Sequence, residues 1–276
     1  MIVNRFVGLL TVLIALFASW PLFAKTVPET LHTSSGSFNV YVAGPSEARG
    51  GIVLVHDWFG VSPSFLGATD RLAKLGYRVI AVDLYDGRRA TTHEEAGALL
   101  GSLDAQLAAQ KIDAAIQSLS LRPRNIAVMG FSMGVKHALA AALRNESIRA
   151  TVLWYGETVN EPKDLKKLQG PALLIVGSAD GPTAADNAAA FSKAADAAGA
   201  AAEVYVYPGA AHAFAQPLFN QGKTYDPIAS ETAWRLSEDF LRRRMKESPL
   251  ALGHAGWPNI HLAKQLRDEN PASAKQ

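Results

Sequence analysis

The sequence has no cysteine, and that absence excludes several kinds of chemistry at once. A disulfide framework, a thiolate metal site and a cysteine nucleophile all need a residue that this chain does not have. Charged residues are few, at 19% of the chain, and the formal net charge is only +2. Such a charge gives no reason to expect nucleic acid as a partner. The histidines show no convincing metal-ligand spacing, so we expect no metal site.

What the chain does have is size and apolar patterning. Its 276 residues are 49% hydrophobic, enough for one domain with a substantial core. Short apolar runs alternate with helix-forming stretches, which predicts an α/β fold: a mainly parallel central sheet with helices on both faces. The expected strands are Ser37–Val42, Gly51–Val55, Arg78–Val82, Ile126–Met129, Ala150–Trp154, Ala172–Val176 and Ala202–Val206. The expected helices are Ser64–Leu75, Thr92–Leu119 with one break near Gly101, Val135–Arg144, Ala184–Ala198 and Glu231–Lys246.

The first residues have the pattern of a secretory signal peptide: a short basic start, an apolar stretch and a small residue at Ala24. We therefore expect an exported protein, periplasmic if the source is Gram-negative, with no stable membrane association once the signal is removed. A retained membrane anchor is the alternative, because the stretch is close to the length that spans a bilayer. The expected organisation is a signal peptide at 1–24, a polar linker at 25–36, one α/β domain at 37–247 and a C-terminal surface extension at 248–276.

The most informative segment is Ile126–Val135, an apolar strand that runs into Gly-Phe-Ser-Met-Gly and then into a helix-forming stretch. This is a G-x-S-x-G pattern in the strand–turn–helix setting of a nucleophile elbow. The turn is so tight that side chains at Gly130 and Gly134 would collide with the neighbouring strand and helix. Ser132 is the candidate nucleophile, and a serine hydroxyl needs a base to act as one.

Two later strands are followed by the acid and the base that such a serine requires, in the chain order that an elbow predicts. Asp180 comes after the strand at 172–176, and His212 comes after the strand at 202–206. The rivals are Asp186, which lies farther from its strand, and His56, which also follows a strand but precedes the elbow. Ser132, Asp180 and His212 are therefore expected to meet at the carboxyl edge of the sheet.

An acyl-transfer serine also needs backbone N–H donors for the oxyanion that forms during the reaction. One should be the N–H of Met133, at the positive end of the helix that follows the elbow. The other should come from the loop after the strand at 51–55, where Trp58 is the candidate.

Four ordered segments resemble the dienelactone hydrolase family of α/β-hydrolases. They are Val-His-Asp-Trp-Phe-Gly-Val at 55–61, Ala-Val-Asp-Leu-Tyr at 81–85, the elbow at 130–134, and Tyr-Pro-Gly-Ala-Ala-His-Ala-Phe at 207–214. The resemblance implies a single-domain α/β-hydrolase fold and hydrolysis of a small-molecule ester or lactone through a covalent acyl-enzyme. It also implies that no cofactor takes part.

The chain departs from the best-known members of that family at its nucleophile and in the loop beside it. Those members use cysteine where this chain has Ser132, and glutamate where it has Asp57. Asp57 either helps to activate the nucleophile or orders the site by capping a turn. The family's arginines bind the carboxylate of dienelactone, and Arg88 and Arg89 are either their counterparts or a solvated basic pair. Together with Tyr85, these residues are candidates for substrate binding or for ordering the site.

Three functions remain open at this point. The first is an exported serine hydrolase of small carboxylic esters or lactones. The second is an amidase or peptidase of the same fold, although no propeller or large lid domain that would gate peptides is evident. The third is a non-catalytic ligand-binding protein of the cell envelope that keeps the hydrolase shell. A complete set of Ser132, Asp180 and His212 at strand ends favours the first.

Overall fold

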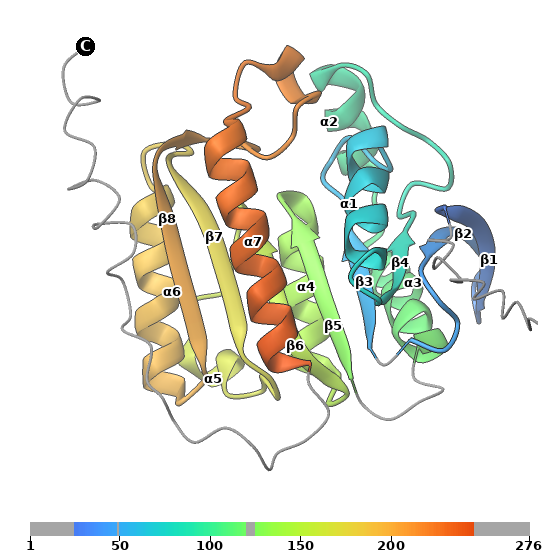
Figure 1. Ribbon diagram of the computed structural model, residues 1–276, viewed down its shortest axis with the longest axis horizontal. Coiled ribbons are helices and arrows are strands. Elements are labelled where there is room, and N and C mark those ends of the chain that lie inside the picture. The colour runs from blue at the N-terminus through green and yellow to red at the C-terminus, as the bar shows by residue number, and fades with distance from the viewer. Residues whose placement is uncertain (1–24, 49, 120–124, 246–276) are drawn as a thin grey trace, which may run out of the picture.

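The computed structural model describes residues 25–48, 50–119 and 125–245 (Figure 1). One sheet of eight strands, in the order β1-β2-β4-β3-β5-β6-β7-β8, forms the centre of this part of the chain. The strands are β1 Val27–Thr33, β2 Gly36–Ala43, β3 Gly51–Val55, β4 Arg78–Val82, β5 Ile126–Phe131, β6 Ile148–Trp154, β7 Ala172–Ala179 and β8 Ala202–Ala211. The helices are α1 Pro63–Ala73, α2 His93–Gly101, α3 Ala105–Leu119, α4 Met133–Arg144, α5 Pro162–Leu165, α6 Ala184–Ala198, the short 3-10 helix η1 Phe219–Gly222 and α7 Pro227–Arg244.

The sheet is parallel from β4 to β8, and at one edge β2 pairs antiparallel with both β4 and β1. The prediction of a mainly parallel sheet is therefore confirmed. Parallel strands end at the same edge, so the loops that follow β3, β5, β7 and β8 lie together. The register pairs Val55 with Gly130, which brings the loop after β3 beside the elbow.

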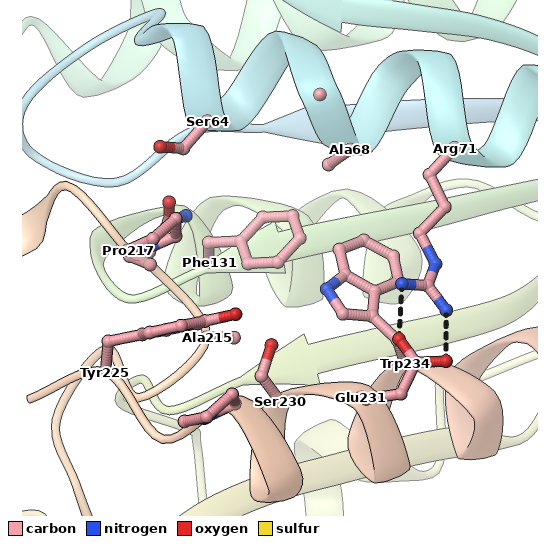
Figure 2. A pocket seen from close by; sticks show the side chains of 13 residues that line it. Ser64, Ala68, Arg71, Phe131, Ala215, Pro217, Tyr225, Ser230, Glu231 and Trp234 are labelled. Carbon is pink, nitrogen blue, oxygen red and sulfur yellow. Dashed lines mark hydrogen bonds and ion pairs between the residues drawn. The ribbon is translucent and has the colours of Figure 1, made fainter. Parts of the chain in front are cut away.

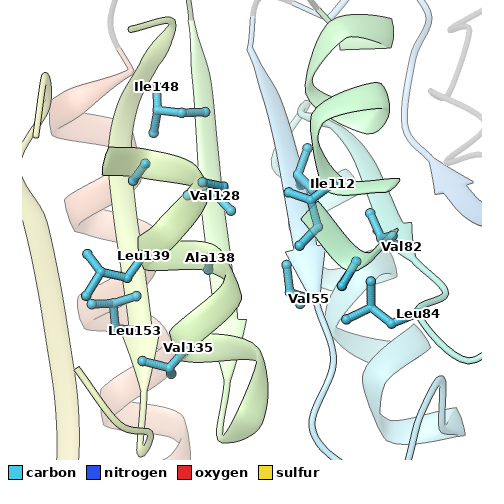
Figure 3. Packing of buried hydrophobic residues seen from close by; sticks show 14 of the residues in the cluster. Val55, Val82, Leu84, Ile112, Val128, Val135, Ala138, Leu139, Ile148 and Leu153 are labelled. Atoms are coloured by element: carbon cyan, nitrogen blue, oxygen red, sulfur yellow. The ribbon is translucent and has the colours of Figure 1, made fainter. Parts of the chain in front are cut away.

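Helices cover both faces of the sheet and divide the buried residues into two cores. On one face, α1 and α7 pack against the sheet, and they lie in front of it in Figure 1. On the other face lie α2, α3, α4, α5 and α6. Figure 3 shows part of this second core, where Val128 and Leu153 of the sheet lie with Ala138 and Leu139 of α4. The helices on both faces that the sequence predicts are confirmed.

The continuous apolar run of β3 is explained by these two cores. Val53 and Val55 belong to the core with α3 and α4, whereas Ile52 and Leu54 belong to the core with α1. Alternate side chains of a strand point to opposite faces, so a strand covered on both faces must be apolar at every position. Full burial of one such side chain stabilises the fold by about 1.5–3 kcal/mol.

The break expected in the long helical stretch is where the sequence places it. The first helix ends at Gly101, and the second begins at Ala105. The Asp104 carboxylate accepts hydrogen bonds from the backbone N–H groups of Gln106 and Leu107, at 2.8 and 2.9 Å. This cap satisfies donors that have no partner within the helix and therefore starts the second helix at that point.

The polar linker expected at 25–36 is wrong, because most of it forms strand β1. Its residues Val27 to Thr33 pair with β2 in a hairpin whose turn closes between Thr33 and Gly36. Most of its side chains are exposed, so the strand is held by backbone hydrogen bonds rather than by apolar burial. The helices α5 and η1, which are only a single turn long, are also not predicted from the sequence.

The expected signal peptide at 1–24 and the expected extension at 248–276 lie outside the described residues. Within residues 25–48, 50–119 and 125–245, no helix has both the length and the apolar character needed to cross a bilayer.

Candidate active site

The elbow holds Ser132 in a backbone conformation that non-glycine residues rarely adopt. Ser132 has φ 51° and ψ −116°, between the last residue of β5 and the first residue of α4. Its N–H donates to the carbonyl of Trp154 at 2.9 Å, and its own carbonyl accepts from the N–H of Val135 at 2.9 Å. Such conformations cost of order 1–3 kcal/mol and persist only where the surroundings enforce them.

The turn at Ser132 requires glycine at three neighbouring positions. A Cβ at Gly130 would lie 2.3 Å from the carbonyl oxygen of Gly134, and a Cβ at Gly134 would lie 2.3 Å from the carbonyl oxygen of Val55. These are the collisions with helix and strand that the motif predicts. Gly156, which the sequence reasoning did not single out, would place a Cβ 2.2 Å from the carbonyl oxygen of Ser132. The elbow therefore fits only if all three side chains are absent.

Ser132, His212 and Asp180 lie in one hydrogen-bonded chain. Ser132 Oγ is 2.9 Å from His212 Nε2. On the other side of the ring, His212 Nδ1 is 2.8 and 3.0 Å from the two carboxylate oxygens of Asp180. The carboxylate can only accept, so Nδ1 carries the proton and Nε2 is free to accept from the serine. The structure thus brings together the three residues expected at the carboxyl edge of the sheet.

The rival acid and the rival base lie elsewhere. Asp186 is exposed in the first turn of α6. His56 is fully buried, its Nδ1 lies 2.5 Å from the carbonyl of Asp57, and its Nε2 accepts from the N–H of Leu84 at 3.1 Å. Burial lowers the pKa of His56 to about 4, so the ring is neutral at ordinary pH. With both nitrogens occupied, His56 orders the loops after β3 and β4.

The two expected oxyanion donors are free to bind a ligand. Met133 is the first residue of α4, and Trp58 lies in the loop after β3. Among the described residues, neither backbone N–H donates a hydrogen bond to any group of the protein. Unpaired N–H groups at a helix N-terminus attract negative charge, because the helix dipole adds to their own partial charges.

Asp57 caps the turn that carries Trp58. Its side chain is only 6% exposed, and its Oδ1 accepts from the N–H of Phe59 at 2.8 Å. Burial raises the pKa of Asp57 to about 6, although the bond from Phe59 and the nearby His212 act in the opposite direction. Of the two roles considered for Asp57, the structure shows the ordering contact, and no hydrogen bond joins it to Ser132 within the described residues.

Tyr85 lies between the elbow and the loop after β3. Its hydroxyl is 3.3 Å from the sulfur of Met133, and its ring lies 4.9 Å from that of His56. Burial, and secondarily the charge of Asp57, raise the pKa of Tyr85 to about 12, so the hydroxyl stays protonated. This contact places Tyr85 against the first residue of α4.

Arg88 and Arg89 are not brought to the serine. Arg88 Nε donates to the carbonyl of Tyr85 at 3.1 Å, and both side chains are exposed. The two arginines line a cavity of about 410 Å³ together with Glu95 and neighbouring residues, and none of Ser132, Asp180 and His212 lines it. Among the described residues, no contact joins Arg88 or Arg89 to Ser132, so the structure does not support their predicted role as ligands of a substrate carboxylate.

Two aromatic side chains that the sequence reasoning missed hold the ring of His212. Tyr155 lies 5.6 Å from it and Phe219 lies 5.8 Å from it, both edge-on. Phe219 also contacts Phe59 and His93, at 5.5 and 5.8 Å between ring centroids. Tyr155 directly follows β6, and this position at a strand end is the one signal that could have identified it.

No group of three or more histidine, aspartate or glutamate side chains that could hold a metal ion occurs in the described ranges. What the site offers is a serine hydroxyl in contact with a histidine, a half-buried aspartate on the other side of that histidine and two free N–H groups. These are the parts of an acyl-transfer site, in which a hydroxyl attacks a carbonyl carbon.

Comparison of the chain with known proteins identifies a family that it matches. The model of the dienelactone hydrolase family matches residues 38–245. A Yersinia pestis protein named "Putative carboxymethylenebutenolidase" is 29% identical over 232 residues, which cover 77% of this chain and 86% of that protein. Protein usf of Aquifex pyrophilus is 26% identical over 214 residues, covering 73% of this chain and 91% of that one.

Solved structures agree on the fold. The dienelactone hydrolase of Anabaena variabilis superposes with a TM-score of 0.62 at 22% identity, over 81% of this chain and 99% of that one. At that level of identity the likeness speaks for the fold, which is that of the α/β-hydrolases. Because the family model spans most of the chain, the protein belongs to the dienelactone hydrolase family.

Proposed function

We propose that this protein is an exported serine hydrolase that cleaves small carboxylic esters or lactones through an acyl-enzyme on Ser132. Its family makes it a carboxylic ester hydrolase. The observation that carries the mechanism is the continuous contact from Ser132 Oγ through the His212 ring to Asp180. A hydroxyl is a poor nucleophile alone, and this contact gives it a base in the required tautomer.

The geometry supports the following step. His212 Nε2 takes the proton of Ser132 Oγ as that oxygen bonds to the acyl carbon, and the carbonyl π electrons move to its oxygen. The resulting oxyanion accepts from the free N–H groups of Met133 and Trp58. When the carbon–oxygen bond to the alcohol breaks, the alcohol oxygen takes the proton from His212. Water then attacks the acyl-enzyme in the same way and releases the acid.

The substrate class follows from chemistry and size. The name of the Yersinia pestis relative refers to a lactone. In this chain Arg88 and Arg89 line a cavity that none of Ser132, Asp180 and His212 lines, and among the described residues no contact joins these arginines to those three. The side chains around His212 are aromatic instead, with Tyr155 and Phe219 on its ring. A short uncharged ester or lactone therefore suits the site better than dienelactone itself.

The test is hydrolysis of p-nitrophenyl acetate and of a simple lactone by the Ser132→Ala variant. We expect activity to fall to the background rate with the melting temperature nearly unchanged, because the small side chain leaves the elbow intact. Ser192→Ala, on α6 and away from the site, is the control and keeps wild-type rates. Full activity of Ser132→Ala would overturn the assignment.

Export is tested separately, by expressing the full chain in a Gram-negative host. We expect the protein in the periplasmic fraction, with an intact mass that lacks residues 1–24. The pattern of the first residues supports this expectation. A full-length protein in the membrane fraction would show a retained anchor instead and would leave the hydrolase assignment untouched.

A further inference from the structure

A second cavity lies on the face of the sheet that α1 and α7 cover, apart from Ser132, Asp180 and His212. Its volume is about 330 Å³, and its walls come from α1, α7 and the loop between β8 and α7 (Figure 2). Aromatic rings of Phe131 and Trp234 form its floor, 6.0 Å apart. None of the three residues proposed for catalysis lines it.

Polar hydrogens point into this cavity without a partner. Figure 2 shows the Ser230 hydroxyl, the Tyr225 hydroxyl and the ring nitrogen of Trp234 directed toward the space between Phe131 and Ala215. Ser230 is 6% exposed and Trp234 is 8% exposed. Among the described residues, neither the Ser230 hydroxyl nor the Trp234 N–H takes part in a hydrogen bond, and neither atom is sealed from solvent. A ligand oxygen that accepts from them would therefore replace water in the cavity.

The charge at the cavity is already balanced. Arg71 donates to both carboxylate oxygens of Glu231, at 2.9 and 3.3 Å, and also binds Glu238. Its guanidinium lies 5.1 Å from the centre of the Trp234 ring. Arg235 also binds Glu231, so two arginines match the two glutamates and the cavity offers no free cation to an anion. A carboxylate ligand would also be repelled by Glu231, so the cavity suits an uncharged molecule.

We propose that this cavity is a ligand-binding site for a small uncharged molecule that has a flat aromatic ring and one carbonyl oxygen. The ring packs on Phe131 and Trp234, and the oxygen accepts from Ser230 and from the Trp234 N–H. The volume is at the lower end of the range for ligand sites, which fits one ring with a short substituent. This site does not depend on the proposed hydrolase activity, because it uses other residues.

Gly67 allows the site to be closed without distorting the fold. It lines the cavity on α1, and a Cβ built there meets no atom within 4 Å. A phenylalanine at this position has room to turn its ring into the mouth of the cavity. Gly97 on α2 is equally open and lies outside the cavity, so Gly97→Phe is a matched control for the loss of a helical glycine.

The experiment measures binding of 4′-fluoroacetophenone by fluorine NMR to the full chain and to four variants. The ketone cannot be hydrolysed, so turnover does not interfere. We expect saturable binding to the wild type and to Gly97→Phe with equal Kd, and at least tenfold weaker binding to Gly67→Phe. Ser230→Ala and Trp234→Phe each remove one donor, and we expect three- to tenfold weaker binding. Circular dichroism melts of all variants show that each is folded.

Two results would overturn the proposal. One is the absence of saturable binding to the folded wild type. The other is binding to Gly67→Phe, Ser230→Ala and Trp234→Phe with the wild-type Kd, which would mean that the ketone occupies another place, such as the pocket at Ser132. Neither result bears on whether Ser132→Ala loses its esterase activity, so the two proposals fail separately.

Discussion

Asp180 acts on Ser132 only through His212. Its two oxygens hold Nδ1 of the ring, and its side chain is 16% exposed whereas that of His212 is 37% exposed. The acid is thus more sheltered from water than the base that it orients, which strengthens its electrostatic effect on the ring. In the proposed reaction, this carboxylate would stabilise the charge that develops on the imidazole.

Asp180→Asn should therefore lower kcat for p-nitrophenyl acetate by about 10³–10⁴-fold, because an amide can hold the imidazole in the wrong tautomer. Asp186→Asn is the matched control, since Asp186 is exposed in the first turn of α6 and lies outside the hydrogen-bonded chain. We expect wild-type kcat for it. Equal losses in the two variants, measured by initial rates, would contradict the assignment of the acid.

Asp57 should make the protein less stable as pH rises. Its pKa is about 6 in the folded chain and near 3.8 when unfolded, so between these values the folded state binds more protons. Stability then falls with pH across this window, by about 3 kcal/mol at most, and is fully present only below the unfolded pKa. In urea titrations, we expect the free energy of unfolding of Asp57→Asn to rise relative to that of the wild type from pH 4 to pH 6. Parallel stability curves would contradict this.

At the scale of elements, the elbow depends on the absence of side chains as much as on Ser132 itself. Strand β5, helix α4 and the segment after β6 meet where Gly130, Gly134 and Gly156 leave no room for a Cβ. The backbone strain at Ser132 is maintained by these close approaches.

Gly156→Ala should lower the free energy of unfolding by about 3 kcal/mol or more, because its Cβ would lie 2.2 Å from the carbonyl oxygen of Ser132. Gly97→Ala is the control, in an open position on α2. There alanine should raise stability by up to about 1 kcal/mol, as it does in helix interiors. Chemical denaturation measures both, and a stable Gly156→Ala variant would show that the elbow can relax.

The sequence predicts those elements whose residues are buried in a regular pattern. Strands β3 and β5 are apolar throughout because both of their faces are covered, and Asp180 and His212 are readable because they follow such strands. Strand β1 is not predicted, because most of its side chains are exposed and show no apolar pattern. The contacts of Tyr155 and Phe219 with His212 are not predicted, because they depend on irregular turns, with φ 39° at Tyr155 and φ 47° at Asn220. Hydrophobic periodicity in the sequence does not indicate such turns.

At the scale of the whole molecule, α7 is tied to its neighbours by charge. Arg71 of α1 binds Glu231 and Glu238 of α7, and Arg243 of α7 binds both oxygens of Glu203 on β8 at 3.1 Å. The Arg71 side chain is 32% exposed, so its bonds are only partly screened by water. The Arg71 pairs fix α7 against α1 beside the cavity that Arg71 and Glu231 line, and the Arg243 pair fixes α7 against β8.

Arg71→Gln should lower the free energy of unfolding by about 1 kcal/mol, because it removes a bidentate pair between two helices. Arg235→Gln is the control: Arg235 binds the same Glu231, but its side chain is 74% exposed and on the same helix. We expect a loss below about 0.5 kcal/mol there. Urea unfolding at low and high salt measures both, and equal losses would contradict a special role of the link between α1 and α7.

The two aromatic rings that flank His212 also give the site a built-in spectroscopic label. We expect ring currents from Tyr155 and Phe219, at 5.6 and 5.8 Å, to displace the resonances of the imidazole protons from those of exposed histidines such as His32. The protonation of the base can then be followed by proton NMR in the resting enzyme, with no substrate present. The same packing that holds the ring against Ser132 would thus allow its charge state to be followed directly.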